Sequence, residues 1–180
     1  MIQLVNDILQ LSHLDSVSET HAQPDMETVD LLDVAKDCVE RQKLNAQRSF
    51  ISLTYLGESA PVRGNRNLLD ELCQNLCDNA IRYNRPGGKV QIVTACTRDG
   101  HCSLTVTDNG IGIPEKDLPR LFDRFYRVDK ARSRESGGTG LGLSIAQEIL
   151  NQHKGSIEIS SEYGKGTSVL ITMPAAEAQA

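Results

Sequence analysis

Residues 136–150, SGGTGLGLSIAQEIL, decide the fold, because they place a cluster of glycines at the entrance of a predicted helix. Four of the seven residues 136–142 are glycine, although glycine is unfavourable inside a helix. Free N–H groups and the positive dipole end make a helix N-terminus an anion site, and glycines let a phosphate approach the backbone. The patterns G-x-x-x-x-G-K-[ST] and G-x-G-x-x-G are both absent. The stretch therefore predicts either an unusual phosphate site or a flexible loop before a helix.

A second helix, predicted over residues 67–83, carries two asparagines on one face. Asn75 and Asn79 are four residues apart, and Arg82 and Tyr83 extend the same side. Amide oxygens suit Mg²⁺, which retains water and phosphate oxygens in its coordination shell. Solvent-facing or capping asparagines explain the same pattern. The predicted buried stripe of this helix is Leu68, Leu72, Leu76 and Ala80.

A third motif, DNGIGIP, follows a predicted strand over residues 101–108. A buried carboxylate on Asp108 could accept a hydrogen bond from an amino group such as that of adenine. Gly110 and Gly112 would let a flat ring approach the backbone. An ordinary Asp-Asn-Gly turn is the alternative.

The remaining elements predict an α+β fold. The strands cluster as hairpins instead of alternating regularly with helices, which favours a two-layer sandwich of about three helices on one face of a mixed sheet of about five strands. The segment APVRGNR, residues 60–66, reads as a turn. Predicted helices span residues 31–47, 67–83 and 141–153, and predicted strands span 50–56, 89–97, 101–108, 156–161 and 167–173.

Composition bounds the class of protein. The 180 residues are 39% hydrophobic and 24% charged, which fits one domain with an appendage. The net charge of −5 argues against nucleic-acid binding by bulk electrostatics. No apolar run is long enough to cross a bilayer, and the N-terminus lacks signal-peptide features. We therefore expect a soluble, cytoplasmic chain.

The five cysteines show no disulfide framework, and their odd number fits a reducing compartment. Cys73 and Cys77 lie four residues apart on one helical face. Half of a zinc site is one interpretation of this pair. The other cysteines offer no second pair of suitable spacing, so we expect both to pack as small hydrophobic side chains.

The order of the motifs carries a specific resemblance. NLCDNAIRY, DNGIGIP, LFDRFYRVD and GGTGLGLSIAQEI follow one another over residues 75–149. Residues 28–174 resemble the catalytic and ATP-binding domain of sensor histidine kinases, within the ATPase family shared with gyrase, heat-shock chaperones and mismatch-repair proteins. The resemblance implies a Bergerat-type ATP-binding fold. Residues 1–18 resemble the end of the second dimerisation helix, with 19–27 as a linker and 175–180 as a disordered tail.

The resemblance also implies roles for the motif residues, with ATP and Mg²⁺ as cofactors. Asn79 would be the magnesium ligand, and Asn75 would lie near the phosphates. Arg82 would reach a phosphate, and Tyr83 would pack beside the base. Asp108 would bind the adenine amino group.

The glycines and the segment before them take the remaining roles. Gly110 and Gly112 would shape the base pocket. A lid over residues 128–139 would be anchored by Phe122 and Phe125. Arg127 would reach the terminal phosphate. Arg124 would be a surface or salt-bridge residue. The phosphate-binding stretch would be Gly138, Thr139, Gly140, Leu141 and Gly142, with the side chains of Leu141 and Leu143 packed beneath as core.

The resemblance implies phosphoryl transfer in place of rapid hydrolysis. Hydrolytic relatives carry a glutamate one turn before the magnesium asparagine, and Asn75 stands at that position. An amide cannot act as a general base at neutral pH. The γ-phosphate would therefore pass to a histidine on a dimerisation helix absent from this chain, since none of its histidines (His13, His21, His101 and His153) matches the acceptor motif.

The implied partners are the phosphoacceptor histidine domain of the parent kinase and a response regulator, with a homodimer in the full-length protein. Membrane attachment would come only through segments upstream of this chain. Two alternatives remain: an ATP-gated binding module without transfer activity, and an ATP hydrolase, against which Asn75 argues.

Overall fold

The computed structural model describes residues 5, 8, 9, 12, 25–128 and 138–176. Residues 5, 8, 9 and 12 are helical, but most of the predicted helix 1–18 and of the lid 128–139 lies outside the described residues. In this described part, no helix is long and apolar enough to span a membrane. The elements are β1 (Glu27–Asp30), α2 (Leu31–Arg48), β2 (Ser52–Gly57), β3 (Pro61–Gly64), α3 (Arg66–Arg82), β4 (Lys89–Cys96), β5 (His101–Asp108), η1 (Glu115–Arg120), α5 (Gly142–Gln152), β6 (Ser156–Glu162) and β7 (Gly166–Pro174).

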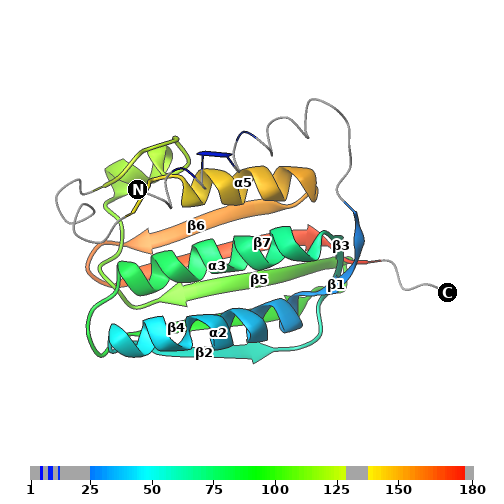
Figure 1. Ribbon diagram of the computed structural model, residues 1–180, viewed down its shortest axis with the longest axis horizontal. Helices are drawn as coiled ribbons and strands as arrows, with labels where there is room; N and C mark the ends of the chain where they lie inside the picture. The colour runs from blue at the N-terminus through cyan, green and yellow to red at the C-terminus, as the bar shows by residue number, and fades with distance from the viewer. Residues whose placement is uncertain (1–4, 6–7, 10–11, 13–24, 129–137, 177–180) are drawn as a thin grey trace.

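The main sheet has the strand order β2-β4-β5-β7-β6. β2 runs parallel to β4, and the other neighbouring strands are antiparallel. Helices α2, α3 and α5 lie side by side over one face of this sheet (Figure 1). The predicted two-layer α+β sandwich with a mixed five-stranded sheet is therefore confirmed.

The helices begin at side-chain caps and pack through apolar faces. The Asp30 carboxylate accepts the backbone N–H of Leu32 at the start of α2, and the Asn65 side chain accepts that of Leu68 at the start of α3. Leu72, Leu76 and Ala80 of the predicted α3 stripe are buried, but Leu69 is fully buried and Leu68 only partly. Buried α3 residues are Leu69, Leu72, Cys73, Leu76, Cys77, Ala80 and Ile81. The core interpretation of Cys73 and Cys77 is thus confirmed.

The predicted turn at residues 60–66 was wrong, because Pro61–Gly64 forms strand β3 and pairs antiparallel with β1. Asp30 holds the two strands together, accepting hydrogen bonds from the Ser59 hydroxyl at 2.6 Å and the Ala60 N–H at 2.8 Å. The disordered tail was predicted to begin at residue 175, but residues 175 and 176 are paired with β3. Ala175 bridges Val62, and the Ala176 N–H donates to the Pro61 carbonyl. These pairings join distant segments, so local composition does not reveal them.

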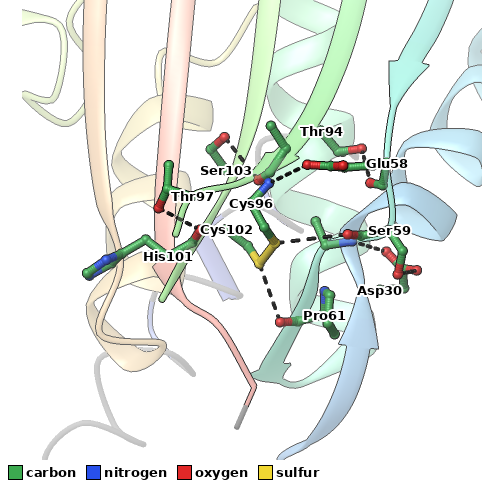
Figure 2. Close-up of a disulfide and its surroundings, with 12 residues drawn as sticks. Asp30, Glu58, Ser59, Pro61, Thr94, Cys96, Thr97, His101, Cys102 and Ser103 are labelled. Carbon is green, nitrogen blue, oxygen red and sulfur yellow. Dashed lines mark hydrogen bonds between the residues drawn. A yellow bond between two sulfur atoms is a disulfide. The ribbon is translucent and has the colours of Figure 1, made fainter. Parts of the chain in front are cut away.

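The cysteine spacing showed no disulfide framework and was interpreted as fitting a reducing compartment, but Cys96 and Cys102 form a disulfide (Figure 2). The antiparallel β4–β5 register places these residues directly opposite each other, with Cα atoms 4.1 Å apart. The disulfide lies beside the Ser59–Pro61 segment, at the opposite end of the sheet from the Asp108 end of β5. Strand register, which spacing alone does not define, produces this pair.

His153 is a buried histidine at the end of α5, only 5% exposed. Its Nε2 accepts the backbone N–H of Asn65 at 3.0 Å, and its Nδ1 lies 2.6 Å from the carbonyl oxygen of Ile149. A neutral ring with its proton on Nδ1 satisfies both contacts. Burial lowers the pKa of His153 below its ordinary value, against the opposing effect of the Ile149 contact.

We expect acid to destabilise the domain partly through His153. A lowered folded-state pKa means that the unfolded chain binds this proton more readily, so stability is full above pH 6.5 and is lost as pH falls through the lowered pKa. Urea unfolding at pH 7.5 and pH 5 would measure this decline. His153→Gln should cost about 1–3 kcal/mol at pH 7.5 and flatten the decline, whereas His101→Gln, at an exposed site, should leave it unchanged. Equal declines in all three proteins would contradict the assignment.

Candidate functional site

A cavity of about 530 Å³ opens at one end of the sheet. The C-terminal end of α3, the end of β5, the β6–β7 turn and the N-terminus of α5 meet there, at the left of Figure 1. The cavity brings together predicted site residues from four separate segments. Those lining it are Asn75, Asn79, Arg82, Tyr83, Asp108, Gly112, Arg127, Gly138, Thr139, Gly140 and Gly142.

Two predicted site residues do not line the cavity. The Leu141 side chain is 0% exposed and belongs to the core, as expected for the side chain but not for a cofactor contact. Gly110 is buried and does not line the cavity, and its N–H donates to the Asp108 carboxylate at 2.8 Å. Both residues therefore support neighbours that face the cavity.

The N-terminus of α5 lies against the asparagine face of α3. A Cβ built on Gly142 would lie 3.8 Å from Nδ2 of Asn79 and 4.0 Å from Cβ of Asn75. The positive end of the α5 dipole and its free N–H groups therefore face the same space as the two amides. This arrangement favours an anionic ligand between the two helices.

Two guanidinium groups also lie near the space between α3 and the N-terminus of α5. A Cβ on Gly138 would lie 2.8 Å from Nη1 of Arg82 and 3.9 Å from Nη2 of Arg127. Arg82 is paired with Asp78 at 2.8 Å, one helical turn before it. Nε and Nη2 of Arg127 and Nδ2 of Asn75 are buried and make no hydrogen bond within the described part of the chain. Unpartnered buried donors are costly, so these three atoms point to a ligand with acceptor oxygens.

The other end of the cavity contains Asp108 and is more apolar, with Ile111, Ile113 and Val169 in its wall. Burial raises the pKa of Asp108, and the hydrogen bonds from the Gly110 and Thr167 backbones only partly offset it. Gly112 has a φ of +66°, and a Cβ there would overlap the carbonyl oxygen of Glu162. A half-buried carboxylate beside apolar side chains suits a flat ligand that carries an amino group.

The segment before the lid is fixed by contacts that sequence reasoning missed. The Tyr126 hydroxyl donates to the buried Asp117 carboxylate at 2.6 Å, and the Arg120 guanidinium lies 4.3 Å from the Tyr126 ring centroid. The Asp117 hydrogen bond raises the pKa of Tyr126. Phe125, expected to anchor the lid, is instead 58% exposed. Tyr126 therefore holds the segment before the predicted lid, and only its position inside LFDRFYRVD hinted at this.

Gly140, the residue after the predicted lid, contacts the segment before it. Its carbonyl accepts the Phe125 N–H at 3.0 Å, its φ is +74°, and a Cβ would come within 3.0 Å of Phe125 Cα. The two ends of the segment 126–139 are thereby held together. Arg85, Lys116 and Tyr163 also line the cavity, although no motif singled them out.

Comparison with known proteins gives one family match over most of the folded part. The family described as histidine kinase-, DNA gyrase B- and HSP90-like ATPase matches residues 64–177. The matched segment contains all the cavity residues named above.

Individual relatives agree with this match. The chain is 38% identical over 178 residues to the sensor-like histidine kinase SenX3 of Mycolicibacterium smegmatis, covering 97% of this chain and 44% of that protein. It is 39% identical over 175 residues to the sensor protein kinase WalK of Staphylococcus saprophyticus, covering 97% and 28%. The chain thus spans less than half the length of these curated relatives.

Solved structures show the same fold. The mycobacterial sensor histidine kinase MprB superimposes with a TM-score of 0.71 at 29% identity, covering 83% of this chain and 97% of that chain. Full-length ShkA in complex with AMPPNP superimposes with a TM-score of 0.82 at 22% identity, covering 99% and 36%. The ShkA likeness concerns the fold alone.

Proposed function

Because the chain belongs to the histidine kinase-, DNA gyrase B- and HSP90-like ATPase family, we propose that it is the catalytic domain of a two-component sensor histidine kinase. It binds ATP with Mg²⁺ in the cavity at the Asp108 end of β5. It then transfers the γ-phosphate to a histidine on a dimerisation helix. The relatives SenX3 and WalK, both named as sensor kinases, support this choice within the family.

The observation that carries the proposal is the set of donors at the phosphate end that have no partner within the described part of the chain. Arg127 and Asn75, whose buried nitrogens have no hydrogen-bond partner among the described residues, line the cavity close to the N-terminus of α5. Leaving such donors unsatisfied costs about 1–3 kcal/mol each. A triphosphate supplies many acceptor oxygens, so its binding removes this cost and neutralises the charge.

The donor set also fits a magnesium ion held largely by the nucleotide. Within the described residues, no group of three or more His, Cys, Asp or Glu side chains could hold a metal. Asn79 on the cavity wall offers one amide oxygen, and Mg²⁺ commonly combines one or two protein ligands with phosphates and water. When bound, the ion neutralises phosphate charge.

The residues around the phosphates hold the triphosphate in position and neutralise its charge. They do not activate water. Arg127 and Arg82 face the phosphate end with their guanidinium groups, which stabilise charge on the transferring phosphoryl group. The acceptor imidazole nitrogen forms a bond to the γ-phosphorus while the bond to the β–γ bridging oxygen breaks and ADP leaves. Asn75 stands where a general base would be needed for hydrolysis, so transfer is favoured over release to water.

The partners follow from the same proposal. The acceptor histidine would sit on a second domain, and the parent kinase would act as a homodimer that phosphorylates a response regulator. Any membrane anchor would belong to other parts of the parent protein.

Calorimetry with a non-hydrolysable ATP analogue tests the binding step. We expect binding by the parent chain to strengthen with Mg²⁺, and Asn79→Ala to weaken magnesium-dependent binding about tenfold, in line with the loss of a metal ligand. Asn67→Ala, on the exposed face at the start of the same helix, is the matched control and should bind as the parent does. An Asn79→Ala affinity equal to that of Asn67→Ala would remove Asn79 from the metal site.

A second assay separates the three possible activities. Labelled ATP is incubated with the chain and a dimerisation-helix domain that carries a phosphoacceptor histidine. Transfer of the labelled phosphate to the histidine would support the proposed histidine kinase activity. Binding without transfer to any acceptor domain would favour an ATP-gated module, and steady phosphate release without an acceptor would favour a hydrolase.

A further inference from the structure

The turn between β6 and β7 brings an aromatic side chain to the mouth of the cavity. Tyr163, at the tip of this turn, lines the cavity and is 70% exposed. None of the four motifs contains it, since it lies beyond residue 149. The turn is close to Asp108, at the end of the cavity where the base is proposed to bind.

The backbone of this turn is clamped on both sides. The Gly164 N–H donates to the Ile111 carbonyl at 2.7 Å, and Nη2 of Arg85 donates to the Gly164 carbonyl at 3.0 Å. A salt bridge at 2.7 Å between Lys165 and Glu162 closes the turn itself. The tip is therefore held between the loop after β5 and Arg85, in the loop after α3.

The packing around the clamp is close enough to fix the position of Tyr163 relative to Asp108. A Cβ on Gly166 would overlap the Asp108 carbonyl oxygen, and one on Gly112 would lie 3.0 Å from the Cα of Tyr163. Both glycines have positive φ values, so the turn and the Asp108 strand end meet backbone to backbone. The exposed ring of Tyr163 thus projects from a fixed backbone beside a cavity wall.

We propose that Tyr163 is a base-binding residue whose ring contacts the purine of the nucleotide, and that Arg85 positions it by holding the Gly164 carbonyl. This inference rests on the proposed function, because it assigns the Asp108 end to the base. Aromatic side chains stack on nucleobases and bury apolar surface when they do so. A ring at the open mouth of the cavity covers the part of the base that the inner wall leaves in water.

A fluorescent reporter tests the contact directly. The chain contains no tryptophan, so Tyr163→Trp introduces a single indole at the tip of the turn. We expect ATP and ADP to change its emission, with a midpoint equal to the calorimetric Kd. Tyr55→Trp, at an exposed tyrosine on the edge strand β2, is the matched control and should show no change.

Affinity measurements complete the test. Tyr163→Ala should weaken ATP and ADP binding about five- to tenfold, at the low end of measured base-stacking effects, while Tyr163→Phe should stay within about twofold of the parent. Arg85→Ala should weaken binding less, and its effect should largely disappear in the Tyr163→Ala background because the two act as one unit.

Two results would overturn this inference while leaving the proposed function intact. One is parent-like ATP affinity in Tyr163→Ala, and the other is unchanged emission of Tyr163→Trp on saturation with ATP. A parent chain that binds no ATP would overturn the proposed function, and this inference with it.

Discussion

Replacing Asp108 with asparagine should weaken ATP binding about 100-fold and at the same time stabilise the empty domain. The carboxylate is the acceptor proposed for the adenine amino group, and losing a charge-assisted bond while placing one donor against another costs about 2–3 kcal/mol. An asparagine oxygen can still accept the Gly110 N–H. Calorimetry with an ATP analogue and urea unfolding of the same protein measure the two effects.

The stability gain has a defined pH dependence. Burial raises the pKa of Asp108 above that of the unfolded chain, so the ionised carboxylate costs stability at neutral pH and the cost disappears as the group is protonated. The advantage of Asp108→Asn should therefore be present at pH 7 and shrink toward pH 4. Asp99→Asn, at an exposed turn distant from the cavity, controls for the loss of one negative charge. Tight ATP binding by Asp108→Asn would place the base elsewhere.

Replacing Arg127 with alanine should reduce phosphoryl transfer about 1,000-fold, within the range known for arginines that stabilise a transferring phosphoryl group. Nε and Nη2 of Arg127 are buried without a partner among the residues that the structure describes, which indicates that Arg127 is held in place for the ligand and not for the fold. ATP affinity should fall about tenfold, and ADP affinity less, because the proposed contact is with the terminal phosphate. Single-turnover transfer to a separate acceptor domain and calorimetry with both nucleotides measure these effects.

Arg124→Ala is the matched control, since Arg124 is exposed and lies outside the cavity lining. It should transfer phosphate at the parent rate. Equal losses of ATP and ADP affinity in Arg127→Ala would move the contact to an inner phosphate, and unchanged transfer would remove Arg127 from the mechanism.

Strong local patterns made the main architecture predictable from sequence. The three helices over the sheet and the β4–β5 and β6–β7 hairpins carry apolar periodicity and turn residues, and they lie where expected. The β1–β3 pair was missed because Pro61 and Gly64 are poor strand residues and their partners lie more than 30 residues away. The disulfide was missed because it depends on strand register, which spacing does not define.

The residues of the candidate site that could be predicted from the sequence are those that lie in motifs. Asn75, Asn79 and Asp108 stand in patterns with a chemical reason, and the structure brings them to one cavity. The contact between Tyr126 and Asp117 and the clamp on Gly164 join segments that share no pattern. Such contacts arise from tertiary packing, so a single sequence carries almost no signal for them.

Strand β2 leaves the domain open to edge-to-edge association, which matters when the protein is handled in solution. β2 is an edge of the main sheet, and its sequence SLTYLG contains no charged residue and no proline from Ser52 to Gly57. Natural sheets discourage edge-to-edge association with lysine, proline or bulges, and β2 has neither of the first two. Within the described residues no strand pairs with the outer side of β2, and Leu56 and Phe50 are exposed beside this edge. Colloidal stability therefore depends on the net charge of −5, which acid removes, so concentrated solutions of the domain are best kept above neutral pH.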